Sequence, residues 1–469
     1  MVIFTQKEDN IFATQKTENM KDSIDFGSME IPKLFRKLLI PTVLGMVFSA
    51  IFVITDGIFV GKGLGSDALA AVNITAPLFM LNTGVGLMFG VGASVVASIH
   101  LSHGKIKTAR INVTQAVAVS SLFLALFSAL VLIYSEEVAY LLGSSERLLP
   151  LALEYIHWFV PFLVFSALLS SGMFYIRLDG SPNYAMMCNV IPAIINIILD
   201  YIFIFIFNWG MMGAALATSL GYTIGAAMIL FYLSRKKNVI HFCRVKLSKK
   251  SMRLTLRNIK YMCRLGASTF LCEAAIACMM FTGNYVFIRH LGEDGVAAFS
   301  IACYFFPIIF MVNNAIGQSA QPILSYNFGT GDNNRVHYAF RLALITAVTT
   351  GALFFLLTAL FSPHIVSLFI DKSYPAYDIA VSGLPLFASG FVFFAANIVS
   401  ISYFQSIEQA RPAMLATLLR GFVFLILCFF TLPLFLDVAG IWLAVPAAEF
   451  FTVLYILAFF RYKRRSFQG

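Results

Sequence analysis

Long runs of apolar residues, separated by short polar segments, follow one another along almost the whole chain. Runs such as residues 122–134 and 422–436 are apolar on nearly every face, whereas a strand of a membrane barrel alternates in polarity. Most runs reach the about 20 residues that a helix needs to cross a bilayer core. The pattern therefore predicts twelve transmembrane helices. We expect them at residues 34–61, 68–99, 109–134, 150–174, 183–208, 210–233, 258–289, 295–325, 337–361, 377–405, 411–436 and 438–460.

Composition excludes a water-soluble fold. Hydrophobic residues make up 59% of the 469 positions and charged residues only 12%, against roughly 25% charged residues in soluble domains. The net charge of +10 does not indicate nucleic-acid binding, because most of the Lys and Arg residues lie in alternate loops rather than in one stripe. This asymmetry predicts a multi-pass protein of the inner (plasma) membrane with both termini in the cytosol. Residues 1–30 lack an apolar run, so they predict a cytosolic tail and no secretory signal.

An internal repeat divides the chain into two halves. The segment from Leu64 to Ala71 (LGSDALAA) is repeated in similar form from Leu291 to Ala298 (LGEDGVAA). Gly104 is matched by Gly331 at the same sequence offset. A third match aligns Pro182 with Pro412 after a small insertion. The predicted units are a tail at 1–30, an N-lobe at 31–233, a basic cytosolic linker at 234–257, a C-lobe at 258–460 and a cytosolic tail at 461–469.

Each repeat contains an even number of spans, so both copies keep the same orientation across the membrane. The predicted fold is an all-α membrane protein in which two pseudo-symmetric six-helix bundles enclose a central cleft. Rocking of parallel halves around such a cleft is the usual basis of alternating access, which favours a carrier over a channel.

Acidic residues inside the spans carry the candidate chemistry, because each costs at least about 2.5 kcal/mol at the centre of a helix. Asp56 lies roughly 33 Å along the first helix and Asp200 roughly 25 Å along the fifth, so both fall in the outer half of the membrane. Asn196 shares a helix face with Asp200, and Thr218 in the sixth helix lies at a similar depth. Glu273 lies near the midplane of the seventh helix. Glu449 in the twelfth helix receives no role.

One pocket formed by Asp56, Asn196, Asp200 and Thr218 would suit a proton or a sodium ion. Two nearby carboxylates cannot both stay charged cheaply in a low-dielectric site, so one takes a proton or the pair shares a cation. The alternative is that Asp56 ends its helix near water and that Asp200 is a hydrogen-bonded structural acid. Glu273 is a candidate for binding a cationic substrate or a second proton, or it is a buried structural acid.

Two further residues have predicted roles in the helices. Pro41 removes one backbone hydrogen bond from the first helix and can act as its hinge. Arg420 lies near the cytosolic end of the eleventh helix and is predicted to extend to the headgroups. The 48 Phe and 18 Met residues allow a pocket for large apolar or aromatic compounds without locating it.

These motifs together resemble the multidrug and toxic compound extrusion (MATE) family over about residues 30–460. The resemblance rests on residues 56–61 (DGIFVG), on the turn at residues 64–70, and on residues 179–182 (DGSP) combined with residues 196–200. It implies a V-shaped pair of six-helix bundles that exports drugs, often cationic and aromatic, in exchange for inward sodium or protons.

The resemblance also assigns roles to single residues. It places Asp56, Asn196, Asp200 and Thr218 in the N-lobe cation site, Pro41 at the kink of the first helix, and Glu273 at an acidic position of the seventh helix found in one branch. Some members of the family carry an aspartate in the tenth helix, but residues 385–405 contain no acid. This departure favours coupling through the N-lobe.

The sequence therefore predicts a secondary active multidrug antiporter that confers antibiotic resistance. It is expected to act as a monomer on drug-like small molecules, without a cofactor and without enzymatic activity, coupled to H⁺ or Na⁺. A lipid-linked flippase would need several basic residues in its cleft, and only Arg264 and Arg420 are basic well inside the predicted spans. A membrane enzyme acting on lipid pyrophosphate would need clustered aspartates for magnesium, which the sequence lacks. The substrate and the choice of ion stay open.

Overall fold

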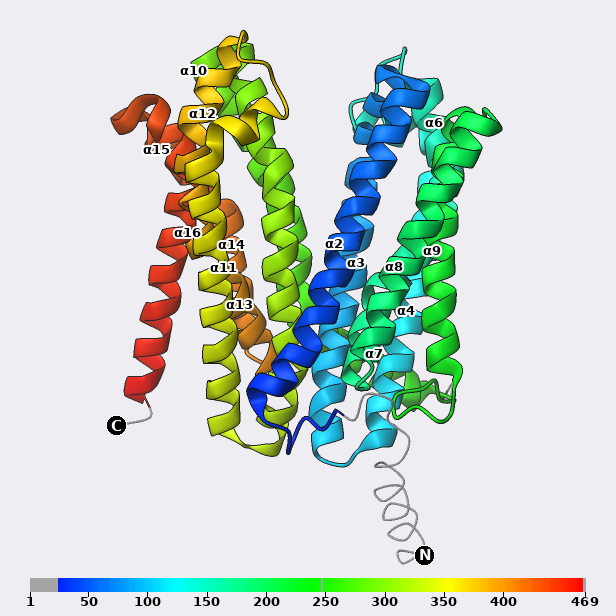
Figure 1. The fold of residues 1–469 in the computed structure, drawn as a ribbon. Coiled ribbons are helices and arrows are strands. Elements are labelled where there is room, and N and C mark those ends of the chain that lie inside the picture. The colour runs from blue at the N-terminus through cyan, green and yellow to red at the C-terminus, as the bar shows by residue number, and fades with distance from the viewer. Residues whose placement is uncertain (1–23, 246–247, 467–469) are drawn as a thin grey trace, which may run out of the picture.

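A computed structural model describes residues 24–245 and 248–466, and its regular elements within these ranges are all helices (Figure 1). The N-terminal half contains α2 (Ile31–Leu64), α3 (Ser66–Ser102), α4 (Ile106–Ile133), α5 (Ser135–Leu141), α6 (Leu149–Phe159), η1 (Val160–Phe162), α7 (Leu163–Leu178), α8 (Pro182–Asp200), η2 (Tyr201–Ile206) and α9 (Gly210–Ser234). The C-terminal half contains α10 (Lys249–Thr330), α11 (Asn333–Ser367), α12 (Pro375–Ala388), α13 (Phe391–Ser406), α14 (Ala410–Leu418), η3 (Leu419–Val423), α15 (Phe424–Thr431) and α16 (Pro433–Ser466).

The predicted spans are present as helices. Within the described residues, 10 helices are long and apolar enough to cross a membrane, or 11 when α12 and α13, which meet at a bend of 41°, are taken as one span. The long α10 contains two of the predicted spans, because its chain turns at Gly292 (φ 64°, ψ −154°). Dividing α10 there yields the twelve-helix arrangement that the sequence predicts.

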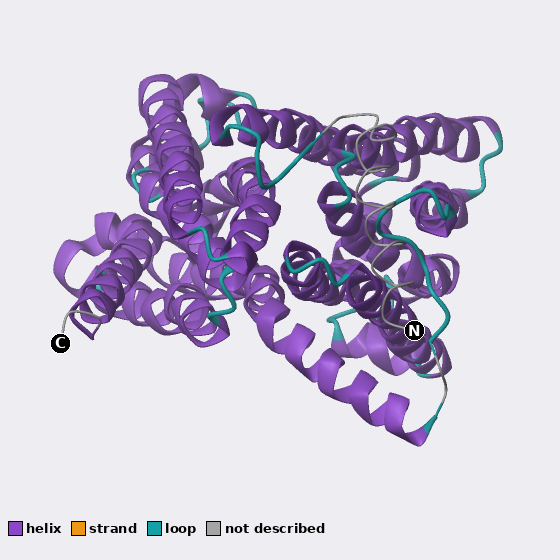
Figure 2. Cartoon of the chain, turned by 90° about the horizontal axis from the view of Figure 1, so that it is seen from below, coloured by secondary structure: helices purple, strands orange, loops and turns teal. Residues whose placement is uncertain are grey.

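The helices form two bundles that meet at the lower end of the molecule and diverge towards the upper end (Figure 1). Seen from below, the bundles lie side by side (Figure 2). The lobes meet closely where α3 crosses α10, because a Cβ at Gly92 would collide with the backbone of Met262 and one at Gly266 with the backbone of Met88. Small residues at such a crossing allow two membrane helices to approach through their backbones.

Backbone geometry confirms the internal repeat. Gly65 and Gly292, which open the repeated segment, both have positive φ (92° and 64°), and so do Gly104 and Gly331 (71° and 79°). Glycine adopts this conformation without the strain that a side chain would add. The two lobes therefore reuse the same turns at the same positions.

The third repeated turn is aligned differently from the sequence prediction. Gly180 and Glu408 both have positive φ (82° and 60°), and each amide bonds to the carbonyl three residues earlier. These two residues are thus equivalent, so Pro182 begins α8 whereas Pro412 is already the third residue of α14. The shared proline marks a similar helix start rather than the same position.

The chain before α2 is folded onto the C-lobe, so the predicted tail at residues 1–30 is wrong for its described part, residues 24–30. Ile24 and Phe26 are buried, with 2% and 7% of their surface exposed. Arg335 at the start of α11 donates to the backbone carbonyl groups of Phe26 (3.1 Å) and Met29 (2.7 Å). Residues 1–23 and 467–469 lie outside the described residues.

Helix α2 crosses from one lobe to the other. Its first residues, including Leu34 and Leu38, share a hydrophobic core with Leu324 of the C-lobe, whereas Val60 belongs to an N-lobe core. Figure 1 shows α2, in dark blue, rising from beneath the C-lobe towards the N-lobe. Pro41 lies between the two packed regions.

The linker between the lobes is shorter than predicted, because α10 begins at Lys249 instead of residue 258. The Ser248 side chain accepts a hydrogen bond from the amide of Ser251 (3.2 Å), which caps this helix start. On the other side, the Asp179 carboxylate accepts from the amide of Ile240 (2.5 Å) and from the Tyr232 hydroxyl (2.7 Å). The acid of the repeated turn thus holds the linker against the N-lobe.

Candidate functional site

Asp56 and Thr218 of the predicted N-lobe site are in direct contact. The Thr218 hydroxyl of α9 donates to Oδ1 of Asp56 on α2 at 3.1 Å. Thr218 is 5% exposed, whereas Asp56 keeps part of its surface accessible. The contact joins the crossing helix α2 to the N-lobe bundle.

Asn196 and Asp200 lie beside this contact on α8. Both are fully buried, and neither carboxylate oxygen of Asp200 nor either polar atom of the Asn196 side chain has a hydrogen-bond partner among the described residues. Asp200 interacts electrostatically with Asp56 and Asn196. The structure therefore brings the four predicted residues together and leaves unused bonding capacity among them.

No basic residue of the described part of the chain neutralises the two acids. The ion pairs within the described ranges are Asp67 with Arg147 and Glu449 with Arg420, and neither involves this pocket. A buried polar group without a partner costs roughly 1 to 3 kcal/mol, and more when it is charged. Two carboxylates, an amide and a hydroxyl that converge without a cation form an oxygen-rich site for a proton or a sodium ion.

Aromatic side chains that the sequence reasoning missed surround the acids. Tyr155 of α6 and Tyr222 of α9 both lie within electrostatic range of Asp56. The Tyr222 ring contacts Phe52 (centroids 5.6 Å apart) and Phe79 (5.8 Å). Tyr222 had a detectable signal, because it follows Thr218 by four residues and shares its helix face. Nothing in the sequence near Tyr155 pointed to the site.

The two other predicted residues lie apart from this pocket. Pro41 lies in α2 at the change of lobe described above, next to Thr42, whose hydroxyl bonds to the carbonyl of Leu38 (2.7 Å). Glu273 of α10 is partly exposed and approaches Gly84 of α3 at the contact between the lobes. The structure thus separates Glu273 from the four residues of the N-lobe pocket.

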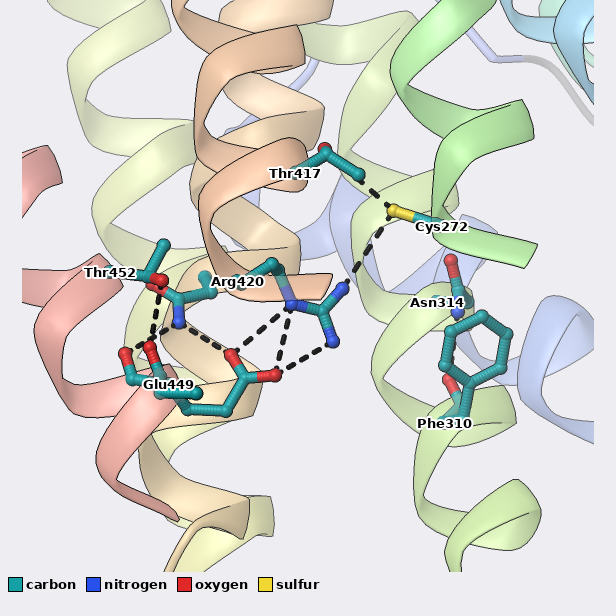
Figure 3. Close-up of polar contacts among 9 residues, drawn as sticks. Cys272, Phe310, Asn314, Thr417, Arg420, Glu449 and Thr452 are labelled. Carbon is teal, nitrogen blue, oxygen red and sulfur yellow. Dashed lines mark hydrogen bonds and ion pairs between the residues drawn. The ribbon is translucent and has the colours of Figure 1, made fainter. Parts of the chain in front are cut away.

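Arg420 does not extend to the headgroups, so that prediction is wrong. It is 5% exposed, and its guanidinium bonds to both oxygens of Glu449, with the shortest distance 2.8 Å (Figure 3). Asn397 of α13 completes the cluster by donating to Oε2 of Glu449 at 2.6 Å. The guanidinium carbon also lies 4.7 Å from the centroid of the Phe394 ring. The reason is that Glu449 supplies a buried counter-charge, which makes the interior the better environment.

Both lobes place these polar residues at an irregular turn of a helix. In the N-lobe, α8 changes to a π-helical turn directly after Asp200. In the C-lobe, Arg420 lies inside the π-helical turn between α14 and α15. Such turns often mark functional positions, because an extra residue redirects the side chains around it.

Arg177 is a second buried cation that the sequence reasoning left in a loop. It lies in the last turn of α7 with 4% of its surface exposed, and its guanidinium donates to Gln318 of α10 (2.9 Å) and to Thr42 of α2 (3.4 Å). These bonds tie the two lobes together beside Pro41. A lone arginine before a turn carries no sequence signal for this role.

Comparison with known proteins finds a family model and several relatives that match this chain. A sequence model of the family described as MatE matches residues 41–202 and 271–430. A protein of Shewanella oneidensis named FAD transporter is 25% identical over 75% of this chain and 77% of its own length. The multidrug export protein MepA of Staphylococcus aureus is 24% identical over 89% of this chain and 91% of its own.

A solved structure shares the fold. It is described as the outward-facing conformation of a multidrug resistance MATE family transporter of the MOP superfamily, and it is 22% identical. The superposition has a TM-score of 0.85 and covers 96% of this chain and 100% of that chain. The bundle arrangement and the divergence of the lobes thus have a close experimental counterpart.

Proposed function

This chain belongs to the MatE family of membrane transporters, and on that premise we propose that it is a secondary active antiporter. It exports organic compounds in exchange for an inward flow of H⁺ or Na⁺. Family membership makes it an efflux-type transporter rather than an enzyme. The coupling ion, the substrate and the location in the inner membrane with both termini in the cytosol are parts of the proposal.

The observation that carries the proposal is the unneutralised acid pair of the N-lobe. Asp200 is fully buried without a hydrogen-bond partner among the residues that the structure describes, and Asp56 accepts a bond from Thr218. A site with a deficit of positive charge gains the most from taking up a cation. Binding and release of that cation at Asp56, Asn196, Asp200 and Thr218 is therefore the proposed coupling event.

Helix α2 connects this event to the shape of the cleft. It carries Asp56 in the part that packs on the N-lobe, and its first turns pack on the C-lobe. Pro41 lacks the amide that would continue the helical bonding, so it is the proposed hinge between the two parts. Neutralising Asp56 changes the interactions that hold the upper part of α2 against the N-lobe. It thereby favours a different angle between the lobes.

Drug-like organic cations are the proposed substrates, with Glu273 at the contact between the lobes as a candidate to bind them. The relative named FAD transporter makes a nucleotide cofactor the competing class. Transport by a single chain is sufficient for this mechanism, because both lobes belong to one polypeptide.

The test is efflux of a fluorescent organic cation from loaded vesicles that contain the purified protein. A proton gradient and a sodium gradient are imposed separately, and an Asp200→Asn variant serves as the control. Acceleration by one gradient that disappears in the variant would support antiport and identify the ion. If neither gradient accelerates efflux of an organic cation or of FAD, the antiporter proposal fails and a lipid-linked flippase becomes the leading alternative.

A further inference from the structure

A cavity of about 940 Å³ lies at the end of the molecule where the described chain begins and ends, away from the acid pocket. Its walls come from both lobes. The N-lobe contributes the last turns of α3 and the first turns of α4, and the opposite wall consists of the linker, the start of α10 and Glu408 in the turn before α14. It differs in size and position from the small pockets around the lobe contact.

The lining of this cavity is basic. Lys107, Arg244 and Arg257 line it together with a single carboxylate, that of Glu408, and with His100. The three basic residues lie on three different segments, α4, the linker and α10, so they are not one solvated helix face. They converge on one space because the fold brings these segments together.

Two helix starts add to the positive potential. Lys107 and Thr108 lie in the first turn of α4, and Ser251 lies in the first turn of α10, and all three line the cavity. The amino-terminal end of a helix carries a partial positive charge that favours anions. The opposing end of α3 is compensated, because its last carbonyl groups accept bonds from the amides of His103, Gly104 and Lys105.

The inner wall is fixed by hydrogen bonds between the two sides. The Gln115 side chain of α4 donates to the Thr255 hydroxyl (2.7 Å) and accepts from Asn258 (3.1 Å), both on α10. Next to them, Asn112 is 1% exposed and its Oδ1 has no hydrogen-bond partner among the described residues. The inner wall is thus a fixed polar surface of amide side chains, suited to a ligand that also carries a hydroxyl or amino group.

Apolar residues complete the lining and narrow the ligand class. They are Val96, Ile99, Ile111, Val245 and Leu254. Inorganic phosphate would leave most of about 940 Å³ unfilled and would not contact these side chains. A phosphate ester with a hydroxyl-bearing organic part matches the basic, polar and apolar portions together.

We propose that this cavity binds the phosphate group of an anionic organic phosphate, either a phospholipid headgroup or a soluble ester. The position favours the headgroup source, because basic pockets at the cytosolic ends of membrane helices recognise anionic lipids. Since the walls come from both lobes, a bound ligand holds their lower ends together. An influence on transport and the preference for the headgroup source rest on the proposed function, whereas binding of an organic phosphate itself does not.

The binding experiment uses the full chain in phosphatidylcholine nanodiscs and native mass spectrometry. The probes are short-chain dioctanoyl phosphatidylglycerol, glycerol 3-phosphate and, as a neutral lipid, dioctanoyl phosphatidylcholine. The test variant is Lys107→Gln with Arg257→Gln, which removes two cations from the cavity. The matched control is Lys105→Gln with Arg253→Gln, which removes two exposed cations from the same regions that do not line it.

We expect phosphatidylglycerol to bind to the wild type and to the control variant and to bind roughly thirtyfold more weakly to the test variant. Selective binding of glycerol 3-phosphate with the same dependence would also support the site and would identify a soluble source. Absence of binding by both anionic probes, or equal loss in the test and control variants, would overturn the proposal and leave a solvated basic surface.

Two further variants complete this binding experiment. Arg244→Gln changes an exposed linker residue outside the helices, so it tests the cavity if the double variant does not fold. We expect it to lower the affinity for the anionic probe about fivefold. The Asp200→Asn variant should bind the anionic probe normally. Loss of ion-driven efflux together with normal binding would thus separate this site from the coupling site.

Discussion

The two lobes share their turns and helix order, but they differ in how they treat a buried acid. In the N-lobe, Asp200 is fully buried without a cationic partner in the described part of the chain, and the second acid, Asp56, lies beside it. In the C-lobe, Glu449 is equally buried, but the guanidinium of Arg420 neutralises it at 2.8 Å. Each site lies next to a π-helical turn, although the two turns fall at different positions of the repeat, and the two sites differ in charge balance.

This difference supports the proposal that the N-lobe is the lobe that responds to an ion. The C-lobe cluster already contains its cation as part of the chain, and Asn397 donates a further hydrogen bond to Oε2 of the same carboxylate. A proton or sodium ion has little to gain there. The N-lobe pocket has the same kind of oxygen ligands without a fixed cation in the described part of the chain, which is why it is the proposed site of ion exchange.

The largest expected effect is that of Asp200→Asn. The amide keeps the size of the side chain but removes the charge that attracts the ion, so ion-driven efflux should be abolished. The protein should insert and fold at least as well as the wild type, because an uncompensated buried carboxylate is lost. Efflux from vesicles and thermal unfolding in detergent measure the two quantities.

Glu449→Gln is the matched C-lobe control for this substitution. It also neutralises a buried acid, but it leaves Arg420 without a counter-charge, so unfolding should occur at lower temperature while ion-driven efflux by the folded fraction persists. Normal ion-driven efflux in the Asp200→Asn variant would break the comparison, because the N-lobe would then not be the coupling lobe.

The next largest effect is on stability, in Arg420→Gln. The substitution leaves the carboxylate of Glu449 buried without its cation, and breaking a buried ion pair in this way costs about 3 to 5 kcal/mol. The thermal unfolding midpoint in detergent should fall clearly. Arg264→Gln removes an exposed arginine of the same lobe and should leave the midpoint close to that of the wild type.

A double variant sharpens this result. Arg420→Met with Glu449→Leu replaces the pair by apolar side chains of similar size, which is often neutral or stabilising. Recovery of the unfolding midpoint together with intact ion-driven efflux would show that the C-lobe pair is structural. Loss of efflux in a stable double variant would instead assign the C-lobe a direct part in coupling.

Much of the fold was predictable, because membrane spans and turns leave strong local signals. Apolar runs gave the twelve helices, and the repeated glycines at 65 and 292 fixed the two halves in register. The predicted linker extended too far because the basic start of α10 has the composition of a loop. The predicted tail extended too far because residues 24–30 are held by bonds to Arg335, which lies about 300 positions later in the chain.

The candidate site was predictable only where one helix carried the pattern. Asn196 and Asp200 share a face of α8, and the depth of Asp56 and Thr218 follows from helical rise. Tyr155 and the bonds of Arg177 and Arg420 depend on which helices pack together, and this is set by tertiary structure. Arg420 shows the limit well, since its partner Glu449 was visible in the sequence without any sign that the two meet.

A smaller effect is expected for Thr218→Val, which tests the contact between α2 and α9. Valine keeps the shape of threonine but removes the hydroxyl that donates to Asp56 at 3.1 Å. Hydrogen bonds to charged groups contribute about 1.5 to 3 kcal/mol, so the ion concentration for half-maximal efflux should shift by about tenfold or more. Thr223→Val is the control, because that hydroxyl donates to the carbonyl of Ser219 in its own helix. Equal shifts in both variants would contradict a specific role of the contact.

The smallest expected effect concerns Asp179, whose equivalent in the C-lobe turn is the apolar Ile407. Burial raises the pKa of the Asp179 carboxyl from its usual value of 3.8 to about 7, although the bonds from Tyr232 and the Ile240 amide act in the opposite direction. The folded protein therefore binds a proton here over a pH range in which the unfolded chain has released it. The stability contribution is fully present below the unfolded pKa, falls as the pH rises towards about 7 and is constant above that value. In Asp179→Asn this fall of stability with rising pH should disappear. The difference in thermal unfolding midpoint between wild type and variant should therefore differ between a pH near the unfolded pKa and a pH above about 7. Asp67→Asn, which alters an exposed acid of the same lobe, should keep the slope of the wild type. A wild-type slope that survives in Asp179→Asn would mean that another group sets the pH dependence and that the two repeated turns differ less than their side chains suggest.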